Sequence, residues 1–123
     1  MTTFRKGSAL VVLIALVALV AAVSALGGSS STAATTVNVT LGKPSEFNIT
    51  LSKKTIVKGV TTFKVVNKGG VSHDFKIAGK KTVTLKTGKT ATLKATLKKG
   101  KYPFLCTLPG HAAGGMKGTL TVK

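Results

Sequence analysis

The sequence predicts an all-β domain, either a β-sandwich or a small barrel, behind an apolar N-terminal segment. From Thr36 onward, apolar and polar residues alternate with a period of two, which is typical of half-buried strands. Clusters of glycine, asparagine and lysine interrupt this pattern at intervals of about 8 to 12 residues, and no stretch between them sustains a helical period. With 123 residues, the chain has room for one such domain.

The N-terminal segment predicts export. Arg5 and Lys6 precede an uncharged run over 9–26, and small side chains near its end offer a cleavage site after Ala25. Because the positive end stays in the cytoplasm, the rest of the chain should cross the membrane. The run has 18 residues, which exceeds the usual signal core and reaches the lower limit for a spanning helix. Residues 1–26 are therefore predicted to be either a cleaved signal peptide or an uncleaved membrane anchor.

A Gly/Ser/Thr/Ala linker over 27–35 separates this segment from a domain over 36–123. A random coil of that length reaches about 15 to 18 Å. We expect the domain to be periplasmic or extracellular. If the anchor is retained, residues 9–26 would keep the domain at the outer face of the cytoplasmic membrane.

Eight segments are candidates for short strands, each bounded by a turn-forming cluster such as NKGG or KKGK. In order they are TVNVTL (36–41), EFNITL (46–51), VTTFKVVN (60–67), HDFKIA (73–78), KTVTL (81–85), TATLKATL (90–97), KYPFLC (101–106) and GTLTV (118–122). Alternation predicts the following core-facing side chains: Val37, Val39, Leu41, Phe47, Ile49, Leu51, Leu93, Ala95, Leu97, Leu120 and Val122. The outward lysines form a solvated face that discourages edge-to-edge aggregation.

The net charge bears on partners more than on fold. Nineteen basic and two acidic residues give +17, and Arg5 is the only arginine. Proteins that read a specific nucleic-acid sequence depend on the bidentate fork of arginine, which lysine lacks. We therefore expect no specific nucleic-acid binding, whereas attraction to anionic surfaces or to an acidic protein partner stays open.

Chemically distinctive residues gather in the stretch CTLPGHAAGGM over 106–116, which contains the only cysteine of the chain. Taken singly, each has a plain structural interpretation: Cys106 as a small buried residue, His111 as a loop residue and Met116 as core filling. A lone cysteine in an exported chain cannot form an intramolecular disulfide, which removes the usual reason for cysteine in that compartment. Together with His73, these three residues complete a set of soft metal ligands.

This ligand set indicates copper. Two imidazoles and one thiolate, with a long axial thioether, are the donors of blue-copper electron-transfer sites. Structural zinc normally takes four cysteine or histidine ligands, and this chain offers three. Between the cysteine and the methionine, Pro109 stiffens the loop and three glycines permit close backbone approach. His73 has to arrive from a different strand.

The segment GKYPFLCTLPGHAAGGMKGTLTV resembles the copper-binding segment of the cupredoxins, the family of plastocyanin, azurin and auracyanin. That family has an isolated first histidine, followed by cysteine, histidine and methionine on one loop, and the similarity extends over 36–123. The resemblance implies an eight-stranded Greek-key β-sandwich that holds one type 1 copper and shuttles single electrons between Cu(II) and Cu(I). The implied metal ligands are His73, Cys106, His111 and Met116.

One residue departs from the family pattern. Its best-known members commonly have asparagine after the first histidine, where it joins the two copper-bearing loops, and this chain has Asp74. An aspartate can still accept hydrogen bonds from the backbone or hydroxyl of Thr107, and it adds charge beside the metal. The resemblance thus assigns Asp74 and Thr107 to the surroundings of the copper. The plainer alternative is that Asp74 pairs with a lysine such as Lys76 or Lys117.

The longest lysine-free stretch of the domain, 102–116, surrounds His111. We predict an uncharged apolar docking patch there, ringed by lysines that steer an acidic redox partner at a rate that falls with salt. The predicted contact residues are Leu108, Pro109, His111, Ala112 and Ala113. The chain is expected to act as a monomer.

Two other functions fit parts of the sequence. Copper delivery or storage outside the cytoplasm would use the same ligands, although such proteins commonly rely on several methionines and this chain has two. A module that binds polyanions or cell surfaces would use the lysines on a copper-free sandwich. An enzyme is not expected, because copper oxidases and nitrite reductases of related fold add further copper sites and this chain has no second histidine cluster.

Overall fold

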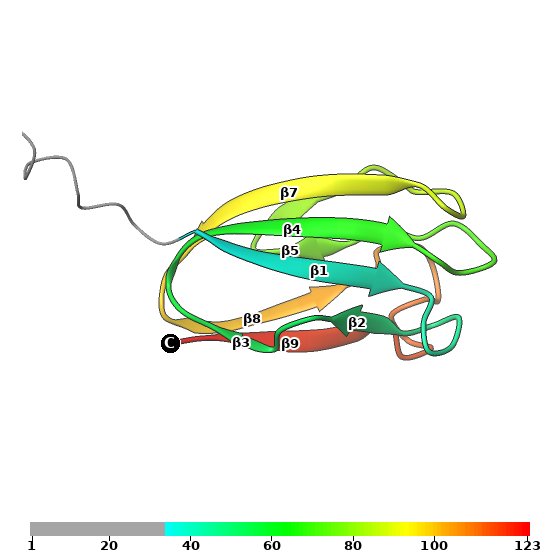
Figure 1. Cartoon of the computed structure of the whole chain (residues 1–123). Coiled ribbons are helices and arrows are strands. Elements are labelled where there is room, and N and C mark those ends of the chain that lie inside the picture. Colours follow the sequence, from blue (N-terminus) through cyan, green and yellow to red (C-terminus); the bar gives the residue numbers. More distant parts are fainter. Residues whose placement is uncertain (1–33) are drawn as a thin grey trace, which may run out of the picture. The chain divides into compact units, whose positions relative to one another are not determined.

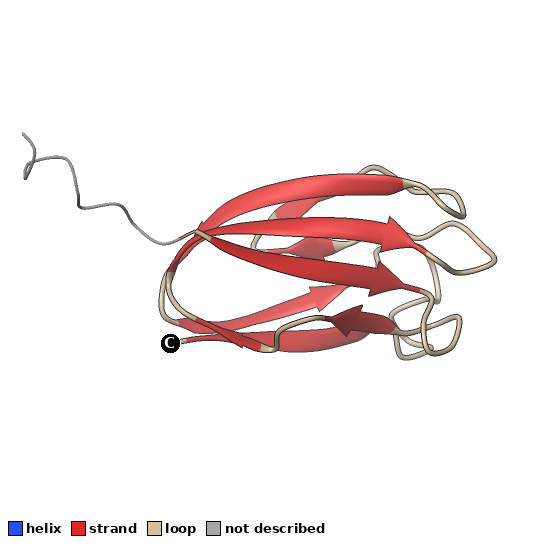
Figure 2. Cartoon of the chain, viewed as in Figure 1, coloured by secondary structure: helices blue, strands red, loops and turns tan. Residues whose placement is uncertain are grey.

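A computed structural model describes residues 34–123, which form two β-sheets packed face to face (Figure 1; Figure 2). One sheet has the order β2 (Ile49–Leu51), β1 (Thr35–Leu41), β4 (Gly59–Asn67) and β7 (Thr90–Leu97). The other has the order β3 (Thr55–Ile56), β9 (Lys117–Val122), β8 (Gly100–Leu105), β5 (Lys76–Ile77) and β6 (Lys80–Lys81). No helix occurs within 34–123, and the predicted all-β sandwich is confirmed.

The first sheet follows directly from the period-two pattern of its strands. β1 pairs in parallel with β4, so that Val37 lies opposite Phe63 and Val39 lies opposite Val65. All four side chains are buried, whereas the residues between them face outward or are only partly covered. β7 pairs with the other side of β4 and buries Leu97. Because the buried face of these strands is mainly apolar, with Thr61 and Asn67 of β4 as buried polar residues, a register shift of one residue would expose the apolar set.

Three phenylalanines join the two sheets at the centre of the core. The ring centroid of Phe75 lies 5.7 Å from those of both Phe63 in β4 and Phe104 in β8. Burial of each ring contributes roughly 1.5–3 kcal/mol. Phe75 is two residues after His73, so this packing also fixes the loop that leads to β5.

The strand predicted over 46–51 is shorter in the structure and begins at Ile49. Residues 45–48 instead form a turn in which the Asn48 N–H donates to the Ser45 carbonyl at 3.1 Å. The Asn48 side chain closes the same turn, because its Oδ1 accepts a hydrogen bond from the Ser45 N–H. The prediction that Phe47 faces the core is wrong, because the turn leaves 41% of its surface exposed.

The strand predicted over 81–85 is also largely missing. Only Lys80–Lys81 pairs with β5, and Val83 is 72% exposed. Leu85 forms one isolated bridge with His73. Conversely, β3 was not predicted, because its two residues, which pair in parallel with the end of β9, are too few to show a period. This strand brings the total within 34–123 to nine instead of eight.

Three connections gather at the end of the sandwich opposite the C-terminus (Figure 1). They are the β1–β2 loop (42–48), the β4–β5 loop (68–75) and the β8–β9 loop (106–116). The Lys68 N–H donates to the Leu41 carbonyl at 2.9 Å, which joins the first two loops. A Cβ on Gly42 would lie 2.4 Å from the Cα of Gly69, so these loops touch through their backbones.

The predicted leader over 1–26 lies outside the described residues, as does nearly all of the predicted linker over 27–35. β1 begins at Thr35, one residue before the predicted start of the domain. Among residues 34–123, none forms part of a helix with the length and apolar character needed to cross a membrane.

Candidate metal centre

His73 lies in the β4–β5 loop, where an isolated bridge holds its backbone. Its N–H donates to the Leu85 carbonyl at 3.0 Å, and the Leu85 N–H donates back to the His73 carbonyl at 2.8 Å. The imidazole is fully buried. A buried ring of this kind needs partners for both nitrogens, and it has them: Nδ1 faces His111 and Nε2 faces Glu46.

Cys106 directly follows β8, and its thiol is 1% exposed. Its N–H donates to the Met116 carbonyl at 3.1 Å, which closes the β8–β9 loop, and its Sγ accepts a hydrogen bond from the Asp74 N–H at 3.5 Å. Burial disfavours the charged form and raises the pKa of the Cys106 thiol above its ordinary value. A metal that binds the sulfur at neutral pH therefore displaces a proton.

His111 occupies a run of tight turns between Cys106 and Met116. Its N–H donates to the Leu108 carbonyl at 3.1 Å, and its carbonyl accepts from the Met116 N–H at 3.1 Å. The side chain of His111 is half-buried. It thus extends from the buried interior of the site to the molecular surface.

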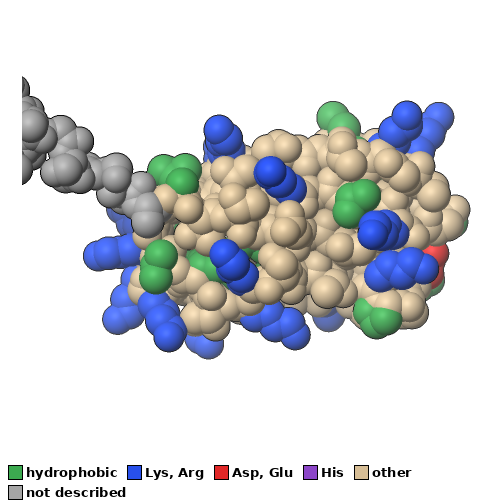
Figure 3. Space-filling model, in the orientation of Figure 1, with side chains coloured by type: hydrophobic (Ala, Val, Ile, Leu, Met, Phe, Trp, Pro, Cys, Tyr) green, Lys and Arg blue, Asp and Glu red, His purple; other side chains and the backbone are tan. Residues whose placement is uncertain are grey.

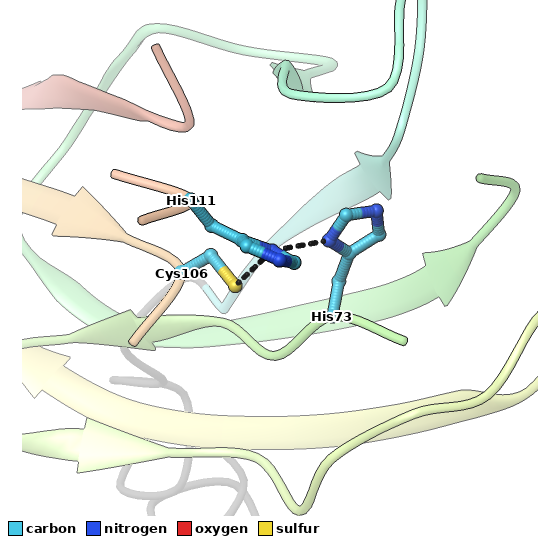
Figure 4. A group of neighbouring side chains, drawn as sticks. All are labelled: His73, Cys106 and His111. Carbon is cyan, nitrogen blue, oxygen red and sulfur yellow. Dashed lines mark hydrogen bonds between the residues drawn. The ribbon is translucent and has the colours of Figure 1, made fainter. Parts of the chain in front are cut away.

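The three side chains converge although they come from two separate loops (Figure 4). His111 Nδ1 lies 3.5 Å from Cys106 Sγ and 3.1 Å from Nδ1 of His73. One ligand atom from each residue lies within 4.8 Å of the others, so a single ion can contact all three. The arrangement places Nδ1 of each histidine, and not Nε2, toward the shared position.

Met116 immediately precedes β9, and its side chain is fully buried. Its carbonyl accepts from Cys106 and its N–H donates to the carbonyl of His111. The fourth residue that the sequence nominated as a ligand is therefore hydrogen-bonded through its backbone to the two others of the loop.

The donor set suits copper. Imidazole nitrogen and thiolate sulfur are ligands for copper, whereas calcium and magnesium take oxygen ligands. The two carboxylates near the cluster are hydrogen-bonded to other groups, Glu46 to His73 and Asp74 to Thr107. A closed zinc site normally has four nitrogen or sulfur ligands from cysteine and histidine, and the cluster within 34–123 supplies three.

Asp74 is fully buried and connects the two ligand-bearing loops. Its Oδ1 accepts a hydrogen bond from the Thr107 N–H at 2.6 Å, and its Oδ2 accepts another from the Thr107 hydroxyl. The lysine nearest to it is neither of the two considered from the sequence, since Lys81 Nζ lies 3.8 Å from Oδ2. Asp74 therefore contacts Thr107 through its carboxylate and the Cys106 sulfur through its backbone N–H.

Glu46 is a residue of this site that the sequence reasoning missed. Its carboxylate lies 2.8 Å from Nε2 of His73 and accepts hydrogen bonds from the N–H groups of Gly70 at 2.8 Å and Val71 at 3.1 Å. These contacts, the Gly70 hydrogen bond foremost, hold the pKa of Glu46 below its ordinary value. Glu46 and His73 are 27 positions apart in the sequence, so no local pattern indicates their contact. The available signal was that the chain has only two acidic residues.

Phe47 was also missed, because the sequence suggested a core position for it. Its ring centroid lies 5.1 Å from that of His111, and the rings meet edge to face. In the lysine-free stretch beside it, Pro109 and Ala113 are exposed and Leu108, His111 and Ala112 are partly exposed. Phe47 therefore adds aromatic surface next to the residues that were predicted to dock a partner.

Comparison with known proteins agrees with this geometry. The sequence matches the model of the cupredoxin-like domain family over residues 10–122, and no curated protein matches it. Among solved structures, auracyanin B superposes with a TM-score of 0.64 at 24% identity, covering 76% of this chain and 92% of its own.

Two further solved structures share the fold at similar TM-scores and similarly low sequence identity. Auracyanin A, described as a "blue" copper protein from the green thermophilic photosynthetic bacterium Chloroflexus aurantiacus, gives a TM-score of 0.62 at 18% identity, covering 74% of this chain and 100% of its own. Rusticyanin from Thiobacillus ferrooxidans gives a TM-score of 0.61 at 22% identity, covering 88% of this chain and 94% of its own.

Proposed function

Because the chain belongs to the cupredoxin-like family, we propose that it is an exported type 1 copper protein that carries single electrons between redox partners. Copper is the cofactor, and it supplies the one-electron Cu(II)/Cu(I) couple. The observation that carries the proposal is the convergence of two imidazole Nδ1 atoms and one thiol sulfur within 4.8 Å. The proposed ligands are His73, Cys106, His111 and Met116.

An electron carrier works fastest when its ligands hardly move between oxidation states. The backbones of the four proposed ligands are fixed by hydrogen bonds that do not involve the metal, including the bridge between His73 and Leu85. Asp74 adds a connection between the two loops through Thr107. This network supports a site whose shape is set by the fold.

The site offers electrons one short path to the protein surface, through His111. His73, Cys106 and Met116 are buried, whereas His111 is half-buried and is flanked by the exposed ring of Phe47. We assign electron exit and entry to His111. The docking patch is formed by Leu108, Pro109, Ala112 and Ala113 together with Phe47, and the lysines around it favour an acidic partner.

Retention of the metal separates this function from copper delivery. Three of the four proposed ligands are buried, so exchange requires the loops to open. The test is to load residues 27–123 with one equivalent of copper and to cycle the protein between ferricyanide and ascorbate beside a Cu(I) chelator. A carrier keeps its copper through repeated cycles. Transfer of the copper to the chelator at the first reduction would support delivery and contradict electron transfer.

A further inference from the structure

The Glu46 carboxylate is hydrogen-bonded to a proposed copper ligand on the side that faces away from the metal position. Its Oε1 lies 2.8 Å from Nε2 of His73, while Nδ1 of the same ring lies 3.1 Å from Nδ1 of His111. The imidazole is fully buried and the carboxylate is 34% exposed. The imidazole of His73 therefore lies between the partly exposed Glu46 carboxylate and the buried position proposed for the metal.

This contact decides which ring nitrogen carries the proton. An ionised carboxylate only accepts hydrogen bonds, so Nε2 must be the donor. In a neutral imidazole, Nδ1 is then left with its lone pair, which is the form that binds a metal. A carboxylate on the outer nitrogen also raises the basicity of the ligating nitrogen.

The surrounding chain is shaped to permit this contact. A Cβ on Gly69 would lie 2.5 Å from Oε1 of Glu46 and 2.9 Å from Nε2 of His73, so any side chain there would collide with the pair. The N–H groups of Gly70 and Val71 hold the same carboxylate from the loop. The Glu46 carboxylate thus faces three donors, the N–H groups of Gly70 and Val71 and Nε2 of His73. The contact leaves no room for a side chain at Gly69.

The loop that carries these donors is itself fixed by Asn67. This side chain is fully buried, donates to the carbonyls of Val71 at 2.8 Å and Leu85 at 2.7 Å, and accepts from the Gly69 N–H at 2.8 Å. The Glu46 contact is consequently held by the β1–β2 and β4–β5 loops together.

We propose that Glu46 is a positioning residue that keeps the proton on Nε2 of His73, directs Nδ1 toward copper and stabilises Cu(II) over Cu(I). The inference rests on the proposed function. Its effect on the metal follows from charge, because a carboxylate hydrogen-bonded to one ligand favours the more positive oxidation state. No hydrogen bond reaches Nε2 of His111 from the residues that the structure describes, so the two histidines differ in their electronic surroundings.

The test compares Glu46→Gln with Thr96→Lys in the context of residues 27–123. Both changes raise the net charge by one unit, but Thr96 is exposed in β7 at the end of the sheet away from the site. In Glu46→Gln we expect Cu(II) affinity to fall about tenfold more than Cu(I) affinity. For a one-electron couple, that ratio raises the reduction potential by about 59 mV. Thr96→Lys should leave the potential nearly unchanged.

A second variant tests the contact without changing the charge. Gly69→Ala should push the carboxylate away from His73 and raise the potential in the same direction. Long-range nitrogen–proton NMR of the diamagnetic Cu(I) form and of the apoprotein reports the proton on Nε2 directly. The resonance of the His73 Nε2 proton should be present in the wild type. In Glu46→Gln and Gly69→Ala it should move upfield, as expected for a weaker hydrogen bond.

The proposed function and the role of Glu46 would be contradicted by different results. A wild type that binds no copper would overturn the proposed function and the role of Glu46 with it. A wild type that binds copper normally, with Glu46→Gln matching Thr96→Lys in potential and an unmoved Nε2 proton, would overturn the role of Glu46 alone.

Discussion

Both carboxylates of the chain are hydrogen-bonded within the metal centre, in a protein that otherwise presents lysine to the solvent. Glu46 engages the first histidine from outside, and Asp74 connects the loop of that histidine to the loop of the cysteine. The Glu46 carboxylate therefore contacts the proposed ligand His73 directly, whereas the Asp74 carboxylate contacts Thr107, the residue after the proposed ligand Cys106. Lys81, which is 3.8 Å from Asp74, offsets part of the charge at the second position.

Asp74→Asn should keep the fold and raise the reduction potential. The amide can still accept from the Thr107 N–H and can donate to its hydroxyl, so the connection between the loops survives while one negative charge is removed. Voltammetry of the copper-loaded protein measures the shift. Thr107→Val is the control, since it removes one hydrogen bond and keeps the charge. A lower potential in Asp74→Asn would contradict this assignment.

Copper uptake near pH 8 should release about one proton from Cys106. Burial raises the pKa of this thiol above the ordinary 9.0, so the free protein holds the proton at that pH. Affinity should consequently fall as the pH falls and rise until the pH passes the pKa of the thiol. Titration in weak buffer with an indicator dye measures the release. Cys106→Ser should release none, and equal release from both proteins would refute the explanation.

The strands whose bounds agree best with the sequence prediction are long ones with a mainly apolar buried face. β7 spans Thr90–Leu97, which is the predicted segment, and β1 and β4 each differ from prediction by one residue at the start. The segment over 46–51 has the same alternation, yet the turn at 45–48 delays the start of the strand to Ile49. Alternation reports which residues suit a strand, but not whether a neighbouring strand is available to pair with them.

The residues of the site likewise fall into two groups: those that the sequence could indicate and those that only the fold brings together. The candidate ligands could be nominated from their chemistry alone, because the chain contains one cysteine and two histidines. Glu46 and Phe47 reach the site only through the turn at 45–48, which brings a distant segment beside His73 and His111. Such contacts depend on how loops fold over one another and leave no periodic trace in the sequence.

Asn67→Ala should lower the free energy of unfolding of the apoprotein by roughly 2 to 4 kcal/mol. The change removes three hydrogen bonds, two of them buried and one partly buried, and leaves the carbonyls of Val71 and Leu85 without this donor. Urea denaturation of residues 27–123 measures it, since the described core lies within 34–123. Thr92→Ala, at an exposed position in β7, should change stability by less than about 0.5 kcal/mol. A similarly small effect in Asn67→Ala would show that the loop is not fixed by this side chain.

Charge is distributed unevenly over the domain that the structure describes. Lysines are spread over the face in Figure 3, and the acidic surface visible there lies at the end where the loops gather. Both acidic residues belong to that end, and the surface around His111 comes from a stretch without lysine. If a redox partner docks around His111, as proposed, it would contact a lysine-free area of a protein that is strongly positive overall.

Electron exchange with small reagents should depend on salt in opposite senses according to their charge. Oxidation of the Cu(I) protein by anionic ferricyanide should slow as ionic strength rises, because salt screens its attraction to a chain of net charge +17. A cationic cobalt complex should show the reverse. Stopped-flow rates between about 10 and 300 mM salt measure both. Equal salt dependence for the two reagents would exclude electrostatic steering at the site.

We propose that His73, Cys106, His111 and Met116 together hold one copper ion. A Cu(II) titration of residues 27–123 and of the Cys106→Ser variant, followed by visible absorption, tests this ligand set. We expect an intense blue or green band that saturates at one copper per chain and is absent from the variant. A colourless complex, no uptake, or a band that survives in Cys106→Ser would contradict it.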